Sequence, residues 1–129
     1  MIAVDKLSRT PIYEQIINSI ERQITAEVLP AGAKLPSVRE LSVKLCINPN
    51  TVQKALAELD SRGIIFSAPG RGSFVADDAK ERILNRQLSK LKEFKELATL
   101  LLTSGADVEI LNGAIKEAAE HLKKEADLL

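Results

Sequence analysis

Residues 35–75 read LPSVRELSVKLCINPNTVQKALAELDSRGIIFSAPGRGSFV, and this stretch decides the fold that the sequence predicts. Ser37 is a preferred N-cap residue, and Glu40 stands three positions later, where a capping box has its acidic partner. Apolar residues at helical spacing follow, which predicts a short helix that ends before Asn48. Asn48 can cap a second helix, and Pro49 suits its first turn, where no backbone N–H is required. The sequence therefore predicts two helices joined by a tight turn.

After Gly63 the pattern changes from helical to extended. Two short apolar runs, residues 64–66 and 73–75, flank a glycine-rich segment at 68–72. A Pro-Gly pair in this segment fits the central positions of a type II turn. We therefore predict a β-hairpin with Arg71 at its tip, where glycines allow the backbone to approach another surface closely.

The second helix of the stretch has two contrasting faces. One face is apolar and predicts burial, whereas the other carries amide, hydroxyl and ammonium groups. Such groups can bind base edges or phosphates in DNA, although a polar helix face is also common simply as solvated surface. The capped helix pair, the short turn and the wing together favour the DNA interpretation, because this layout places a helix in the major groove. The outward-facing residues are Asn50, Thr51, Gln53, Lys54 and Ala57.

The chain has 129 residues, enough for one domain or for a small domain with an appendage. Its 18 basic and 18 acidic residues give a formal net charge of zero, which argues against a generally basic coat for nucleic acid. The distribution is uneven, because six basic and three acidic residues lie between Pro30 and Phe74, and nine basic and eleven acidic residues follow Ala76. The basic excess coincides with the predicted helix pair and wing.

Cys46 is the single cysteine, so no intrachain disulfide can form and a reducing compartment is expected. We expect Cys46 to be a small buried filler and His121, the single histidine, to be solvated. No spacing of His, Cys and carboxylate residues predicts a metal site, and no cofactor is expected. The sequence shows neither a signal-peptide core nor a run long enough to span a membrane, which predicts a soluble, cytoplasmic protein.

Upstream of the decisive stretch, residues 1–9 are expected to form an irregular arm. Thr10 is expected to cap a helix that begins at Pro11. Five isoleucines at helical spacing should make this helix the main wall of the core. They are Ile12, Ile16, Ile17, Ile20 and Ile24.

Downstream, residues 77–129 predict a helical hairpin that is separate from a winged domain at residues 1–76. One long amphipathic helix is expected to run to about Ser104, and a second to begin after Asp107. So small an element rarely folds alone, so its apolar face must be covered by the winged domain or by a second copy of the chain. We favour the second copy, in a two-fold homodimer. The candidate dimerisation residues are Leu88, Leu91, Leu101, Ile115 and Leu122.

Blocks at residues 10–13, 32–41, 48–52 and 70–75 occur in the order and spacing of a known family. With them the chain resembles the GntR family of bacterial transcription regulators, and its short tail resembles the YtrA subfamily. The likeness covers roughly residues 8–76. It implies a mainly α fold with a small β-hairpin, namely a winged helix-turn-helix that binds operator DNA as a dimer, followed here by the two-helix hairpin.

The chain departs from the family pattern at several positions. Some long-tailed members have arginine where this chain has Pro49, and arginine or lysine is common where Gln53 stands. These departures imply a different operator sequence. The family usually has a glycine where Glu27 and Val28 stand, a departure that touches loop geometry.

Arg39 matches an arginine that in this family faces DNA from the helix before the recognition helix. The alternative is a surface arginine paired with Glu40 or Glu58, and the resemblance favours DNA contact. The resemblance and the residue chemistry together give one set of candidate DNA-binding residues. They are Ser37, Arg39, Asn48, Asn50, Thr51, Gln53, Lys54, Gly70, Arg71 and Gly72.

The resulting functional hypothesis is a dimeric, sequence-specific transcription regulator, most simply a repressor that occupies a palindromic operator in double-stranded DNA. The alternative is a winged-helix protein-interaction module without specific DNA binding. An enzyme is not expected, since no set of nucleophile, base and acid is present. The predicted hairpin offers little room for an enclosed effector pocket, and the sequence does not determine whether a small-molecule effector exists.

Overall fold

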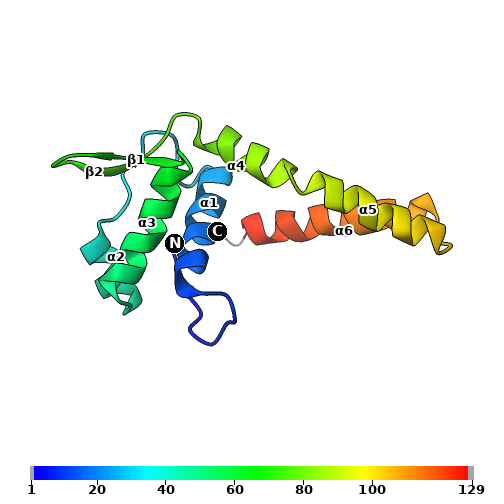
Figure 1. Cartoon of the computed structure of the whole chain (residues 1–129), viewed down its shortest axis with the longest axis horizontal. Coiled ribbons are helices and arrows are strands. Elements are labelled where there is room, and N and C mark those ends of the chain that lie inside the picture. Colours follow the sequence, from blue (N-terminus) through cyan, green and yellow to red (C-terminus); the bar gives the residue numbers. More distant parts are fainter. Residues whose placement is uncertain (1, 128–129) are drawn as a thin grey trace. The chain divides into compact units, whose positions relative to one another are not determined.

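The computed structural model describes residues 2–127, and its elements are arranged in the order that the sequence predicts (Figure 1). The fold is mainly helical with one two-stranded antiparallel sheet, which confirms the predicted class. The described chain divides into two compact units that meet between Asn85 and Arg86. The elements are α1 (Ile12–Thr25), α2 (Val38–Leu45), α3 (Pro49–Ser61), β1 (Ile65–Ala68), β2 (Gly72–Val75), α4 (Ala79–Leu88), α5 (Leu91–Thr103) and α6 (Val108–Asp127).

The helix pair α2 and α3 has the predicted caps. Ser37 Oγ accepts a hydrogen bond from the backbone N–H of Glu40 at 3.0 Å. Asn48 Oδ1 accepts one from the N–H of Asn50 at 2.8 Å. Each bond satisfies a donor that the first turn of a helix leaves without an intrahelical partner, so both helices begin where the sequence predicts.

Two predictions about the ends of helices are wrong. Cys46 is exposed rather than buried, because it ends α2 in the left-handed conformation with φ 54°. Thr10 does not cap the first helix, since Pro11 occupies the N-cap position of α1 and no side chain bonds there. The carbonyl of Thr10 instead accepts a hydrogen bond from the Gln15 side chain at 2.8 Å.

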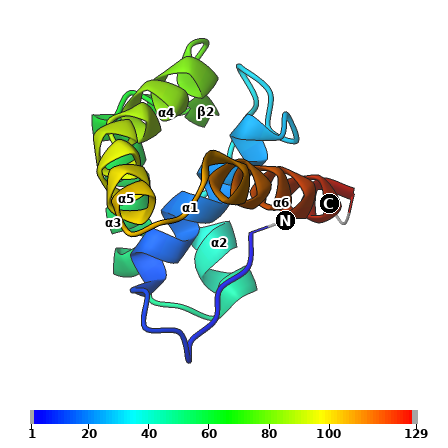
Figure 2. The ribbon, with the colours of Figure 1, turned by 90° about the vertical axis from the view of Figure 1, so that its right-hand side faces the viewer.

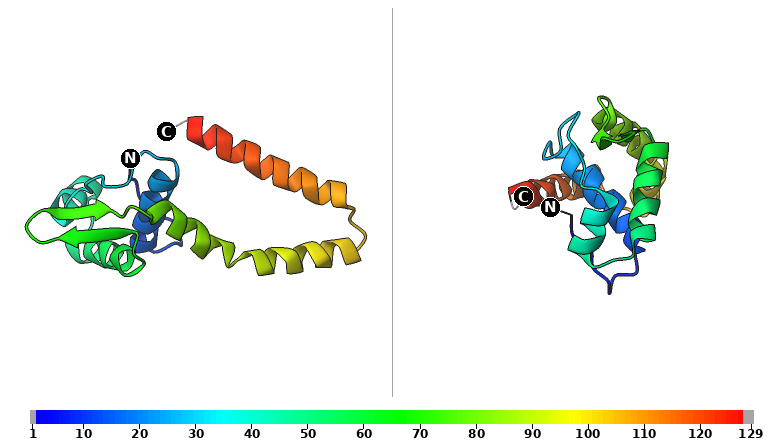
Figure 3. Two further views of the ribbon diagram at one scale, coloured as in Figure 1. Left: turned by 90° about the horizontal axis from the view of Figure 1, so that it is seen from above. Right: turned by 90° about the vertical axis from the view of Figure 1, so that its left-hand side faces the viewer.

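The wing is an antiparallel hairpin whose register runs from Ile65 opposite Val75 to Ala68 opposite Gly72 (Figure 3). The N–H of Arg71 donates to the carbonyl of Ala68 at 2.9 Å, which closes a four-residue turn. Pro69 and Gly70 hold its central positions, and Gly70 has φ 75°. A positive φ at that position defines the predicted type II turn.

The outer edge of the wing is also paired. The segment before α2 runs along β2, with the N–H of Leu35 bonded to the carbonyl of Ser73 and the N–H of Val75 bonded to the carbonyl of Ala33, both at 2.9 Å. Lys34 forms an isolated bridge with Phe74. These bonds hold the wing to the segment that leads into α2.

The core of the first unit forms around α1, which packs against α3, and α2 packs against α3 as well (Figure 2). The isoleucine stripe is buried as predicted, apart from the half-buried Ile12. Two residues of α4, Ala79 and Ile83, are also buried in this core. The first unit therefore extends to Asn85, beyond the boundary predicted at Ala76.

The second unit differs from the prediction in one respect. The long helix expected from residue 77 to about Ser104 is interrupted by a turn at Ser89 and Lys90, so α4 and α5 are separate. Asp107 Oδ1 accepts the N–H of Ile110 at 2.9 Å, which caps α6 as predicted. The chain reverses between α5 and α6, and the two helices then diverge from the turn (Figure 3).

Candidate nucleic-acid interface

The face of α3 that points away from the core is polar and accessible. Asn50, Gln53 and Lys54 are exposed, and Thr51 is half-buried. The opposite face is buried, with Val52, Ala55, Leu56 and Leu59 in the core. Amide side chains presented from one face of a capped helix suit hydrogen bonding to base edges in the major groove.

Arg39 projects from the first turn of α2 and is exposed. Among the described residues it has no hydrogen-bond or ion-pair partner. Glu58, one of its two alternative partners from the sequence, instead accepts a hydrogen bond from Arg62 Nε at 3.0 Å. The guanidinium of Arg39 is therefore available to bind an external anion or acceptor.

The two capping side chains, Ser37 and Asn48, are exposed, and each already accepts a backbone N–H bond. Their oxygens therefore serve first to fix the start of α2 and α3. The first turn of α3 has no backbone N–H left over, since Pro49 has none and the N–H groups of the next three residues all bond to Asn48. The geometry assigns these two residues to orienting the helices.

Lys54 of α3 is exposed and contacts α1. Its Nζ is 3.9 Å from the centroid of the Tyr13 ring in α1, a cation–π contact. The Tyr13 hydroxyl donates to Glu14 Oε1 at 3.2 Å, and this hydrogen bond to a carboxylate raises the pKa of Tyr13 above its ordinary value. Lys54 therefore lies at the flank of α3 that faces α1.

The tip of the wing carries one exposed cation between two glycines with positive φ. Arg71 has no hydrogen-bond or ion-pair partner in the described part of the chain. Gly72 has φ 112°, and a Cβ added there would lie 3.0 Å from Lys34 Cε. The backbone angle favours glycine at this position, whereas the end of the Lys34 side chain is flexible and could move aside.

Sequence reasoning missed Lys34 as part of the wing. Its side chain lies against Gly72, and its backbone pairs with Phe74. The signal for this placement is its position in the extended segment before Leu35, but the pairing partner lies far along the chain. Lys34 therefore adds a second cation near Arg71 at the base of the hairpin tip.

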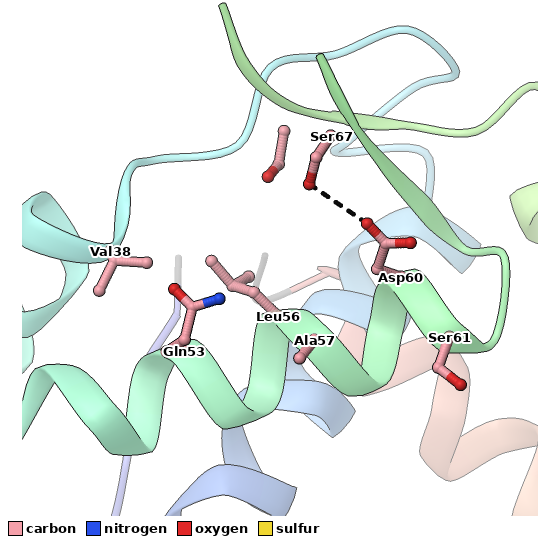
Figure 4. Close-up of a pocket in the computed structure, with 8 residues that line it drawn as sticks. Val38, Gln53, Leu56, Ala57, Asp60, Ser61 and Ser67 are labelled. Atoms are coloured by element: carbon pink, nitrogen blue, oxygen red, sulfur yellow. Dashed lines mark hydrogen bonds between the residues drawn. The ribbon is translucent and has the colours of Figure 1, made fainter. Parts of the chain in front are cut away.

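A hollow of about 450 Å³ separates α3 from the wing (Figure 4). The Gln53 amide points into it from α3, and the Asp60 carboxylate accepts a hydrogen bond from the Ser67 hydroxyl at 3.2 Å. This bond joins the C-terminal half of α3 to β1. The lining residues are Val38, Gln53, Leu56, Ala57, Asp60, Ser61, Ser67 and Ser73.

The predicted dimerisation residues are all exposed in the single chain. Leu91 is 45% exposed and Leu122 is 66% exposed, and the other three lie between these values. The sequence prediction left out further exposed apolar residues of α5 and α6. They are Phe94, Leu97, Leu100, Leu102, Val108 and Ile110.

Residues 2–127 show neither a metal-binding cluster nor a membrane-spanning helix. No group of three or more His, Cys, Asp or Glu residues there is placed to hold a metal ion. No helix in the same range combines the length and apolarity needed to cross a membrane. His121, within α6, is exposed as predicted, and its Nε2 lies 3.4 Å from Glu125 Oε1.

Comparison with known proteins gives consistent matches. Residues 12–75 match the family described as bacterial regulatory proteins, gntR family. The chain is 40% identical over 124 residues to the HTH-type transcriptional repressor YtrA of Bacillus subtilis, covering 95% of each chain. A GntR family transcriptional regulator from Listeria monocytogenes has a similar structure, with TM-score 0.68 and 35% identity over 88% of this chain and 98% of that chain.

A third similar protein has been solved in complex with DNA. The DNA-binding domain of AraR in complex with operator ORX1 aligns with a TM-score of 0.52 and 31% identity. The alignment covers 57% of this chain and 90% of that domain.

Proposed function

This chain belongs to the GntR family of bacterial regulatory proteins, and from this premise we propose that it represses transcription as a homodimer that occupies a palindromic operator. The observation that carries the proposal is an exposed polar face on α3 together with Arg39 on the capped helix before it, which has no hydrogen-bond or ion-pair partner among residues 2–127. Both features lie on one compact unit. A regulator of this kind would act in the cytoplasm, on double-stranded DNA.

In the proposed complex α3 enters the major groove. The amides of Asn50 and Gln53 would then reach base edges, where a paired amide and adenine form two hydrogen bonds. Ser37 and Asn48, which cap α2 and α3, would fix the orientation of the two helices against the DNA. Thr51 lies at the same end of α3 and has a hydroxyl that suits a phosphate contact.

The wing would contact the backbone beside the groove. Arg71 supplies charge, and Gly70 and Gly72 remove side-chain bulk that would keep the tip away from DNA. Phosphate contacts of this kind set position and affinity and carry little sequence information. The division of labour is therefore α3 for sequence and the wing for affinity.

The dimer is supported by the open apolar faces of the second unit. One winged unit contacts only a few base pairs, whereas two linked units bind half-sites about one helical turn apart. Linkage makes the second contact nearly intramolecular, which raises the affinity without new contacts. The exposed leucines and Ile115 of α4, α5 and α6 supply the apolar surface that such a linkage needs.

The test is selection of bound sequences by the full-length protein from a random pool of duplexes. We expect enrichment of a two-fold symmetric site with half-sites about one helical turn apart. Affinity for that site should fall steeply with salt, since phosphate contacts release counterions. Enrichment of no sequence would contradict the proposal and favour the protein-interaction alternative, and an asymmetric single half-site would contradict the dimer.

A further inference from the structure

The N-terminal loop, residues 5–10, is held in one shape by a single glutamine. Gln15 Oε1 accepts the N–H of Asp5 at 2.7 Å, while its Nε2 donates to the carbonyl of Asp5 at 2.9 Å and to that of Thr10 at 2.8 Å. One side chain on α1 thus closes both ends of the loop. Ile2, just upstream, is buried in the core and anchors the incoming chain.

The loop also has hydrogen bonds of its own. Asp5 Oδ1 accepts the N–H of Leu7 at 2.9 Å, and Ser8 Oγ accepts the N–H of Thr10 at 3.2 Å. With its backbone satisfied in this way, the loop presents Leu7, Ser8 and Arg9 to solvent, and Leu7 is 95% exposed. These bonds, together with those to Gln15, define the conformation of the loop.

The loop is tied to the recognition helix by Lys6. Its Nζ donates to the carbonyl of Cys46 at 3.0 Å, in the turn immediately before Asn48 caps α3. Figure 1 shows the loop, in dark blue, at the N-terminal end of α1. Tyr13 at that end of α1 contacts Lys54 of α3. The loop therefore lies beside the N-terminal end of the exposed polar face of α3.

The charge of the loop is suited to a phosphate. The Asp5 carboxylate is used within the loop, and the Lys6 ammonium is used on Cys46. Arg9 remains exposed, and in the described chain it has no hydrogen-bond or ion-pair partner. A guanidinium held on an ordered loop loses little freedom when it binds a phosphate oxygen.

We propose that the N-terminal loop is a third DNA-contacting element beside α3 and the wing, in which Arg9 binds a backbone phosphate next to the N-terminal end of α3. This inference rests on the proposed DNA-binding function. Its contact is with the backbone, so it adds affinity on every sequence and alters no base preference. Lys6 and Gln15 are positioning residues, since they hold the loop and do not reach the DNA.

The test measures binding of the full-length protein by fluorescence anisotropy over a salt series. Two labelled duplexes are used, one of random sequence and one enriched from the random pool. We expect Arg9→Ala to weaken binding to both duplexes by about 3- to 10-fold. The salt slope, which is the steepness with which the logarithm of the binding constant falls with the logarithm of the salt concentration, should decrease by about 0.9, the value for one lost phosphate contact. Arg9→Lys should restore most of the slope.

Arg22→Ala is the matched control, because Arg22 is an exposed arginine at the opposite end of α1 and the charge change is the same. We expect it to bind as the wild type does. Gln15→Ala releases the loop and should weaken binding less than Arg9→Ala, with an unchanged slope. Circular dichroism of each variant verifies that the unit is folded.

The outcomes separate the two proposals. Wild-type affinity and slope for Arg9→Ala, together with weakened binding by Arg39→Ala, would overturn the loop inference and leave the proposed function intact. Binding to the random duplex without selection of any site would overturn the proposed function. The effect of Arg9→Ala on affinity and salt slope can still be measured on that duplex, so the loop inference is tested separately. A wild-type protein that binds neither duplex would overturn both.

Discussion

The ammonium group of Lys54 lies 3.9 Å from the centre of the Tyr13 ring, so a cation of the recognition helix is held by α1. Lys54 is exposed as well, and its charge stays at the edge of the proposed interface. The Lys54–Tyr13 contact therefore both joins α3 to α1 and fixes the position of the Lys54 charge beside the proposed DNA interface.

The first prediction concerns this pair. In a double-mutant cycle with Lys54→Ala and Tyr13→Leu, we expect a coupling free energy of about 0.5–1 kcal/mol, the range for an exposed cation–π contact. Chemical denaturation of the full-length variants measures it. Tyr13→Phe is the control, because it keeps the ring and loses only the hydroxyl bond to Glu14. Additive effects of the two substitutions would show that the contact carries no energy.

The second prediction concerns Arg39. Its guanidinium has no partner within the described chain, so Arg39→Ala should leave the stability nearly unchanged and weaken specific binding by about 1–3 kcal/mol. Preference at one operator position should relax. Anisotropy on the enriched duplex and on single-base variants measures both effects. Lys44→Ala removes a cation from the last turn of the same helix and should matter less; equal losses for the two variants would refute a specific role for Arg39.

The third prediction concerns the wing. Arg71→Ala should weaken binding on all sequences alike and lower the salt slope by about 0.9, because the lost contact is to a phosphate. Folding should be intact, since Arg71 is exposed at a turn that Pro69 and Gly70 form. Anisotropy over a salt series, paired with thermal denaturation, measures the two effects. A slope equal to that of the wild type would exclude Arg71 from the interface.

The fourth prediction concerns Glu27, a non-glycine residue with a positive φ of 61°. Glu27 follows the C-cap of α1, and the N–H of Val28 bonds to the carbonyl of Gln23 at 2.8 Å. Left-handed backbone costs a non-glycine residue about 1–2 kcal/mol, and the added flexibility of glycine offsets part of this. We expect Glu27→Gly to raise the free energy of unfolding by up to about 1 kcal/mol.

Glu27 also forms an ion pair with Lys80 at 3.1 Å, and both side chains are more than half exposed. Such pairs contribute about 0–1 kcal/mol, so Lys80→Ala is the control that isolates the lost pair from the backbone effect. Urea denaturation of the two variants gives the comparison. A destabilised Glu27→Gly variant beside a neutral Lys80→Ala variant would refute the strain argument.

The fifth prediction concerns the second unit. A chain that ends at Asn85 keeps Ala79 and Ile83 in the core and should fold, run as a monomer and bind a palindromic site far more weakly. In the full chain Leu91→Asp should shift the protein toward the monomer, because an unpaired charge is costly in an apolar interface. Analytical ultracentrifugation over a concentration series measures the mass of each species.

Lys92→Asp is the control for Leu91→Asp. It places an aspartate at the next position of α5 and should leave the dimer intact. Leu91 is 45% exposed in the single chain, so its replacement should not unfold the monomer. A dimeric chain ending at Asn85 would show that the interface lies in the first unit and would refute the assignment of α5 and α6.

Local sequence predicted the winged elements well where each depends on neighbours within a few residues. Ser37, Asn48 and Asp107 cap helices as expected, since a cap bonds a backbone N–H two or three positions on. It failed at Thr10 and Cys46. There a capping preference and a burial preference lost to backbone geometry that neighbouring segments impose.

What the sequence alone determined is therefore the order of elements, the caps, the type II turn of the wing and the family likeness, because these follow from short-range spacing. Only the tertiary structure decided which cations are free. Lys6 is bonded to Cys46, Lys34 lies across Gly72, and Lys54 covers Tyr13, whereas Arg9, Arg39 and Arg71 have no partner within the described residues. The reason is physical: each of these lysines meets a partner tens of residues away, and folding alone brings the two together.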